Sequence, residues 1–198
     1  EIARQVADEV DMPMMVHIDV PPPTLADVLG LMRKGDVLTH CFRPFPNSPA
    51  TADGKVREAV LEARARGVIF DIGHGMGSFS FATARTMLKN KFLPDCISSD
   101  VHALCIDGPA FDLLTTMSKF VELGMDFNEI IRSATETPAK ALLRPDLGTF
   151  RIGSAGDASI IEWRKGAFDY VDSTGEHLKG QSRLLADRVI INGAVFNG

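Results

Sequence analysis

The sequence lacks the features of a membrane protein, a nucleic-acid-binding protein or a disordered chain. No apolar run approaches the ~20 residues that a membrane-spanning helix needs, and the first residues show no signal-peptide pattern. The 21 basic residues form no cluster and are outnumbered by 26 acidic ones. We therefore expect neither a nucleic-acid nor a membrane partner. Hydrophobic residues make up 45% and charged residues 24% of the 198 residues, which is typical of a globular chain.

Cysteine is scarce, and its pattern indicates reduced thiols. Cys41, Cys96 and Cys105 are odd in number and form no C-x-x-C pair. This usage is typical of a reducing compartment, so we expect a cytoplasmic protein. No suitable base accompanies any of these cysteines in sequence, which argues against a thiol nucleophile.

The beginning of the chain also lacks a recognisable start. Glu1 opens a helix-like stretch, IARQVADEV, that no cap or strand precedes. We interpret the chain as a piece of a longer protein, although trimming of a complete protein would leave the same pattern.

Strand and helix patterns alternate along the first three quarters of the chain. Short apolar runs predict strands at 14–18, 36–40, 67–72 and 95–99. Apolar residues at helical spacing predict helices at 24–32, at 55–66, from the glycine-rich turn 73–77 to about 90, at 111–123, at 128–134 and near 139. At the start of the first of these helices, Thr24 and Asp27 resemble a capping box. The proline-rich stretch 42–49 predicts a loop. This spacing of strands favours βα units in a parallel sheet.

The pattern changes after Gly148. Short strand-like runs are predicted at 158–163, 168–171 and 188–191, and Asn192-Gly193 is a hairpin-turn signal. We therefore predict an α/β fold in two parts. Residues 1–147 would carry the parallel sheet, and residues 148–198 would form antiparallel strands of a separate small β-domain.

Side chains that can bind metal or transfer protons lie at the end of each of the four predicted parallel strands. They are His17, His40, Asp71 together with His74, and Asp100. The carboxyl ends of parallel strands share one rim in α/β folds, so we expect these side chains to lie close together. Imidazole and carboxylate groups are ligands of zinc and similar ions. The pattern therefore predicts part of a metal site.

Each of these residues also has a structural alternative. A histidine on a buried strand is often a hydrogen-bonded core residue. Asp100 could cap the loop that follows it, but at the end of an apolar strand we expect its carboxylate to be bound rather than buried and unpaired. The same property at four successive strand ends favours a site. His102 could support Asp100 or lie on the surface, and we predict that His177 is a solvated loop residue.

The glycine-rich turn 73–77 permits two interpretations. It follows a predicted strand and precedes a predicted helix, as the dinucleotide-binding fingerprint G-x-G-x-x-G does. Counted from Gly73, however, the third glycine of that fingerprint falls on Ser78, so the match is incomplete. Alternatively the glycines, Gly75 among them, let a substrate approach the backbone beside His74.

Six segments resemble the amidohydrolase superfamily and, within it, the dihydroorotase-like metal-dependent deacetylases and amidohydrolases. In chain order they are MVHIDVPPP, GDVLTHCF, FDIGHGMGSFSF, ISSDVHA, TPAKAL and LGTFRIGSAGDASII. The resemblance covers nearly the whole chain. It implies a (β/α)8 barrel of the TIM type, in which the four predicted strands would be strands five to eight, followed by strands of a small β-sandwich.

The resemblance also implies roles for the strand-end residues. His17 and His40 would be metal ligands, Asp100 would bind metal and carry a proton during catalysis, and His74 would face the substrate. The family's H-x-H pair on strand one and bridging lysine on strand four have no counterpart in this sequence. Part of the ligand set would therefore lie outside this chain, which could be inactive alone.

These implications predict hydrolysis of an amide, a cyclic amide or an acyl ester of a small molecule by metal-activated water. One or two divalent ions are expected, with Zn²⁺ first among the candidates. Half of a barrel leaves an unpaired edge strand, which favours a homo-oligomer. Two alternatives stay open: a non-catalytic fragment or assembly subunit, and a dinucleotide-binding module built on the glycine turn.

Overall fold

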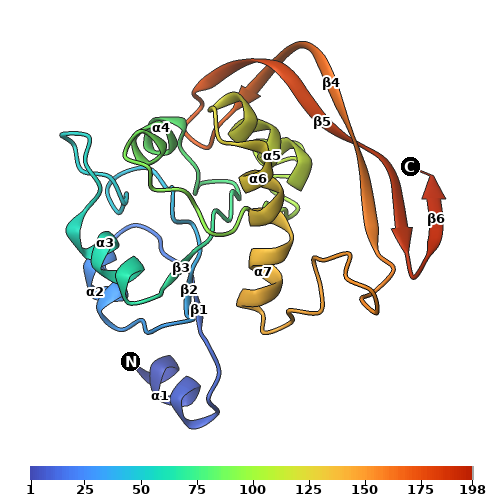
Figure 1. Cartoon of the computed structure of the whole chain (residues 1–198). Coiled ribbons are helices and arrows are strands. Elements are labelled where there is room, and N and C mark those ends of the chain that lie inside the picture. Colours follow the sequence, from blue (N-terminus) through green and yellow to red (C-terminus); the bar gives the residue numbers. More distant parts are fainter. Residues whose placement is uncertain (198) are drawn as a thin grey trace.

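The computed structural model describes residues 1–197 and has an α/β fold with two separate sheets (Figure 1). The first sheet is parallel, in the spatial order β1 (Met15–Val16), β2 (Val37–Leu38) and β3 (Ile69–Phe70). Each of these strands lies within a predicted one. The fourth predicted strand is reduced to an extended segment beside β3: Asp71 and Cys96 form an isolated parallel bridge, and the Ile72 amide donates to the Cys96 carbonyl at 3.0 Å.

The helices follow the predicted order. They are α1 (Ile2–Glu9), α2 (Leu25–Gly30), α3 (Glu58–Ala65), α4 (Phe81–Lys89), α5 (Leu113–Glu122), α6 (Phe127–Ala134) and α7 (Glu136–Ala141). The capping box of α2 is confirmed, because the Asp27 amide donates to Thr24 Oγ1 and the Thr24 amide donates to the Asp27 carboxylate. Helix α3 begins later than predicted, since the residues before it form a small antiparallel bridge between Ala50 and Val56. Within residues 1–197, no helix combines the length and apolar character needed to cross a bilayer.

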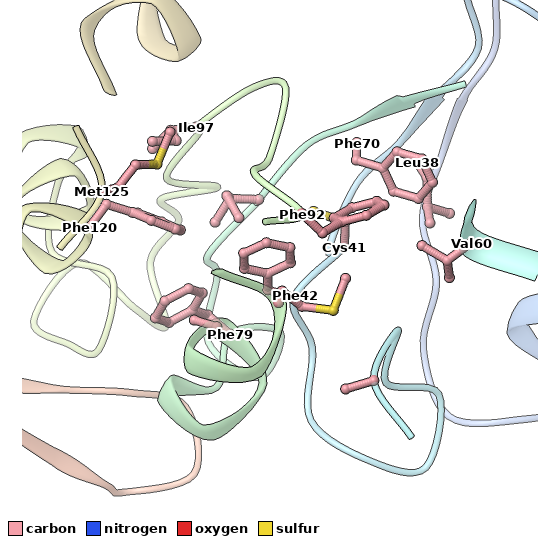
Figure 2. Packing of buried hydrophobic residues seen from close by; sticks show 14 of the residues in the cluster. Leu38, Cys41, Phe42, Val60, Phe70, Phe79, Phe92, Ile97, Phe120 and Met125 are labelled. Carbon is pink, nitrogen blue, oxygen red and sulfur yellow. The ribbon is translucent and has the colours of Figure 1, made fainter. Parts of the chain in front are cut away.

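Phenylalanines fill the interior between the parallel strands and the helices (Figure 2). Phe42, Phe70, Phe79 and Phe120 are fully buried, and the ring centroids of Phe79 and Phe120 lie 5.6 Å apart. Full burial of a side chain of this size contributes about 1.5–3 kcal/mol. Phe42 follows β2, and Phe79 ends the loop that follows β3. The core therefore anchors the two loops that leave the carboxyl ends of these strands.

The second sheet is antiparallel, as predicted. It contains β4 (Ala158–Val171), β5 (His177–Ile191) and β6 (Ala194–Asn197). The predicted runs 158–163 and 168–171 are one strand with irregularities in its register. Asn192 and Gly193 connect β5 to β6 with φ angles of +50° and +78°, as a two-residue hairpin turn requires. His177 was expected in a loop, but it begins β5.

The β4–β5 ribbon shares the core of the parallel part in the described chain. Tyr170 and Leu184 belong to the same buried cluster as the phenylalanines. The Leu184 amide donates to Ser118 Oγ of α5 at 2.9 Å, and the Ser182 amide donates to the Glu122 carboxylate at 3.0 Å. Figure 1 shows the ribbon arching past α5. The parallel sheet before Gly148 and the antiparallel sheet after it therefore pack on one shared core.

Candidate active site

The carboxyl ends of the parallel segments bring predicted site residues to one edge of the sheet. His17 follows β1, His40 follows β2, and Asp100 follows the extended segment beside β3. Two of them have an unusual backbone, since φ is +64° at His40 and +46° at Asp100. Non-glycine residues in this left-handed region are uncommon and cluster at functional sites. This edge of the sheet therefore has the backbone features of a functional site.

His17 and His40 contact each other. Their ring centroids lie 4.5 Å apart with the planes at 82°. The His17 side chain is 62% exposed, whereas His40 is 5% exposed. The two imidazoles therefore lie together at the same edge of the sheet, as expected from the strand ends, one exposed and one buried.

The hydrogen bonding of His40 determines which of its nitrogens is available. Nδ1 lies 2.6 Å from the Gly73 carbonyl oxygen, which can only accept a hydrogen bond. Nδ1 therefore carries the proton, and Nε2 keeps its lone pair in the neutral ring. Burial lowers the pKa of His40, with the Gly73 carbonyl opposing the shift. The neutral ring with one nitrogen fixed by a carbonyl is the form in which histidine binds metals.

Asp71 lies inside the fold and braces the strand ends. Thr39 Oγ1 and Ser98 Oγ donate to its Oδ2 atom at 2.7 and 2.8 Å. Ser98 Oγ in turn accepts a hydrogen bond from the Gly73 amide at 3.0 Å. Burial raises the pKa of Asp71, and the two hydroxyl groups oppose that shift. Asp71 thus ties the ends of β2 and β3 to the extended segment.

Asp100, whose carboxylate we expected to be bound, is an exposed residue. Its backbone carbonyl accepts from Cys105 Sγ at 3.5 Å. Within residues 1–197 no hydrogen bond occupies its carboxylate oxygens, so the expected alternative of a loop cap has no support. The carboxylate lies over Gly75, where an added Cβ would come within 2.6 Å of Oδ2. Gly75 therefore makes room for this carboxylate.

His74 was expected to face the substrate. It is instead fully buried, and its ring does not face the open edge. Nδ1 lies 2.9 Å from the Gly75 carbonyl, and Nε2 lies 2.7 Å from Lys119 Nζ of α5. The ring also stacks on Phe79, with centroids 4.7 Å apart. Burial, followed by the Lys119 charge, lowers the pKa of His74 to about 3. With both nitrogens occupied, this ring has no free group for a substrate in the described chain.

The glycine turn serves the packing of the strand ends. Gly73 has a φ of +46°, and an added Cβ would lie 2.2 Å from Thr39 Oγ1 and 2.9 Å from His40 Nδ1. Helix α4 begins only at Phe81, where Ser80 is the N-cap. In a dinucleotide fold the glycine turn leads directly into the helix N-terminus that receives the phosphates. The structure therefore contradicts the dinucleotide interpretation of this turn.

Two residues beside His17 were not predicted. Asp19 Oδ2 lies 4.0 Å from His17 Nε2. Arg43, almost fully buried, donates to Asp19 Oδ1 at 2.8 Å and to the Ile18 carbonyl. Its hydrogen bond is the main cause that lowers the pKa of Asp19. Asp19 lies two residues past His17 in the sequence and could have been noted, but the arginine reaches it from the loop after β2, which only the fold reveals.

The hydrogen-bond and ion-pair partners of the other two histidines are residues outside this edge. His102 is exposed, and its Nδ1 accepts from the Leu104 amide at 3.3 Å. His177 is exposed on the ribbon, with Nδ1 3.1 Å from Asp169 Oδ1. It is solvated as predicted, although it lies in a strand.

The residues at the edge fit a metal ion only in part. The contacting imidazoles of His17 and His40, with Nε2 of His40 left unprotonated by the Gly73 carbonyl, suit a divalent ion that prefers nitrogen ligands. Within residues 1–197, however, no three histidine, cysteine or acidic side chains gather closely enough to hold an ion. The described residues therefore do not by themselves form a complete metal site.

The chain is similar in sequence to a hydrolase family and to deacetylases. Residues 45–195 match the amidohydrolase family. A deacetylase of Enterococcus faecalis is 36% identical over 200 residues, covering 100% of this chain and 54% of the relative. A deacetylase of Agrobacterium fabrum is 30% identical over 194 residues, covering 98% of this chain and 47% of the relative.

Two solved structures have a fold similar to that of this chain. The crystal structure of an adenine deaminase has a TM-score of 0.96 and 36% identity, covering 100% of this chain and 54% of that one. The crystal structure of a dihydroorotase has a TM-score of 0.86 and 28% identity, covering 99% and 54%. The chain thus spans about half the length of the relatives it matches.

Proposed function

The chain belongs to the amidohydrolase family, and on that premise we propose that it is the carboxyl-terminal half of a metal-dependent hydrolase. The reaction would be cleavage of an amide, a cyclic amide or an acyl ester of a small molecule by metal-activated water. The observation that carries the proposal is the contact between His17 and His40, with His40 Nδ1 held by the Gly73 carbonyl at 2.6 Å. The similarity to deacetylases, a dihydroorotase and an adenine deaminase supports a C–N hydrolase.

In this proposal the four parallel segments are strands five to eight of a (β/α)8 barrel. Residues 1–147 form that half-barrel, and the β4–β5–β6 sheet within residues 148–198 contributes to a small β-sandwich. The coverage of about half of each relative supports this assignment. The first half of the barrel, with the remaining metal ligands, would come from a longer protein.

His17 and His40 would hold the metal through imidazole nitrogens, with Asp100 as a carboxylate ligand. A bound divalent ion, with Zn²⁺ first among the candidates, supplies a Lewis acid and lowers the pKa of water. The Gly73 carbonyl keeps His40 in the tautomer that presents Nε2. The Asp71 brace holds the ends of β2 and β3 in register.

Asp100 would move the proton. Its exposed carboxylate has no hydrogen-bond partner within residues 1–197 and lies over Gly75, so the oxygen that does not bind the metal would be free to accept a proton from attacking water and return it to the leaving group. A group in this role contributes roughly 10²–10⁴ to kcat. Gly75 and the turn around it would contact the substrate through the backbone, with His74 supporting the turn from behind rather than binding the substrate with its ring. The loops at 42–49 and 101–109 would shape the pocket.

The test is hydrolysis of N-acetylated amino acids, acetyl esters and a cyclic amide by the full-length protein that contains this chain. His40→Ala should reduce turnover by roughly 10²-fold or more, because a metal ligand is lost. His177→Ala is the matched control, since this histidine is exposed on the ribbon, and it should keep full activity. Treatment with a chelator should abolish turnover, and added zinc should restore it.

Chelator-resistant hydrolysis, or full activity in His40→Ala, would refute the metal-dependent mechanism. A metal-replete protein that cleaves none of the three substrate classes would instead favour a non-catalytic chain.

A further inference from the structure

Lys119 is a fully buried lysine with three oxygen or nitrogen partners from distant segments. Its Nζ atom lies 2.7 Å from His74 Nε2, 2.7 Å from the Pro109 carbonyl and 2.8 Å from the Val171 carbonyl. The side chain is 0% exposed. A lysine in this position is unusual, because burying an ammonium group is costly unless each of its protons finds an acceptor.

The protons around Lys119 can be assigned from the geometry. The Gly75 carbonyl beside His74 Nδ1 can only accept, so Nδ1 carries the proton of the neutral ring. His74 Nε2 then has a lone pair and must accept from Lys119. The two carbonyls also accept, so Nζ donates all three of its hydrogens and is an ammonium group.

The surroundings balance the buried charge in part. The Nζ atom lies 6.0 Å and 5.9 Å from the ring centroids of Phe79 and Phe81, within the range of cation–π attraction. Burial lowers the pKa of Lys119 to about 7, and the charges of Asp172 and Asp112 oppose the shift. Asp172 is itself buried and accepts from the Phe81 amide at 2.7 Å.

The partners of Lys119 connect the ribbon with the candidate site. Val171 ends β4, Pro109 belongs to the loop after Asp100, and His74 lies at the centre of the glycine turn. That turn holds His40 through the Gly73 carbonyl and lies against Asp100 through Gly75. In the described part of the chain, Lys119 makes no hydrogen bond to His17, His40 or Asp100, so it acts on these residues indirectly, through His74 and through the loop that contains Pro109.

We propose that Lys119 is a positioning residue: it holds His74 in the Nδ1-protonated tautomer and thereby fixes the 73–75 turn against His40 and Asp100. It also joins that turn to the end of the β4 strand. The consequence for catalysis rests on the proposed hydrolase function, whereas the tautomer of His74 does not.

The first measurement is ¹⁵N NMR of histidine-labelled full-length protein, with His74→Gln to assign the signal. His74 should be neutral, with Nδ1 protonated and Nε2 unprotonated. A ring protonated at Nε2, or at both nitrogens, would overturn the proposal in the unaltered protein.

The second measurement compares Lys119→Met with Lys89→Met, an exposed lysine at the end of α4. Lys119→Met should change the His74 tautomer signal and lower kcat for N-acetylated amino acids roughly 10- to 100-fold, as loss of positioning does, with KM and metal content little changed. Lys89→Met should change neither. An unchanged tautomer signal in folded Lys119→Met would refute the proposal. If Lys119→Met does not fold, the tautomer in the unaltered protein decides alone.

A protein with the expected tautomer but no hydrolysis would contradict the proposed function and leave the positioning of His74 intact. The two failures are therefore distinguishable.

Discussion

Replacing Gly73 by alanine tests the packing that holds the candidate site together. Gly73 has a left-handed φ of +46°, and an added Cβ would lie 2.2 Å from Thr39 Oγ1 and 2.9 Å from His40 Nδ1. Left-handed backbone costs an alanine about 1–2 kcal/mol, and overpacking of a tight site adds about 1–3 kcal/mol. We therefore expect Gly73→Ala to lower the free energy of unfolding by about 2–5 kcal/mol.

The assay is urea unfolding of the full-length protein, with the change taken at constant m-value so that it reflects stability. Gly77→Ala is the matched control: it lies in the same turn, no heavy atom comes within 4 Å of an added Cβ, and its φ lies outside the left-handed region. A surface change of this kind should stay within about 0.5 kcal/mol. Equal effects of the two substitutions would refute the argument that Gly73 is required by Thr39 and His40.

Two further predictions concern charge. Asp100→Asn should lower kcat roughly 10²–10⁴-fold and leave urea unfolding unchanged, because the exposed carboxylate makes no hydrogen bond within residues 1–197; full activity would remove its role as proton carrier. Acid should destabilise the fold through His74, whose pKa is about 3 in the fold and ~6.5 in the unfolded chain. The unfolded chain then binds more protons at this histidine between these values, so the contribution of His74 to stability is complete above about pH 6.5 and falls by up to ~1.4 kcal/mol per pH unit below it. Urea unfolding of wild type and His74→Gln from pH 7 to 4 should show their difference shrinking as pH falls, and a constant difference would contradict the assignment of His74 as a buried neutral ring.

Local sequence patterns were sufficient to predict where a residue lies when its position depends only on its own strand or helix cap. The ends of β1 and β2 placed His17 and His40 at one edge, and the Thr24 cap was visible because it uses residues three positions apart. The parallel strands are shorter than predicted, and the fourth is only a bridge.

The start of β5 was missed for a physical reason. Its inward positions at Gly180 and Ser182 carry small residues, so no apolar alternation marks the strand. An added Cβ at Gly180 would lie 2.7 Å from the Tyr170 ring, which shows why a small residue is needed there. The need comes from a neighbouring strand that a local pattern cannot reveal.

The burial of His74 could not be predicted either. Its partner Lys119 lies 45 positions away on α5, where all residues from 115 to 120 are buried and no polar face identifies the lysine. Asp71 is a similar case, since its hydroxyl partners come from two other segments. Residues at strand ends can therefore be predicted as a group, but which of them face outwards depends on distant partners.

The most direct test of the account is the metal content of the full-length protein, measured by elemental analysis for wild type, His40→Ala and His177→Ala. The account predicts at least one divalent ion per chain in wild type and in His177→Ala, and a fall in metal affinity of at least about tenfold in His40→Ala. Equal metal content and affinity in His40→Ala and His177→Ala would contradict the claim that the edge formed by His17 and His40 is a metal site.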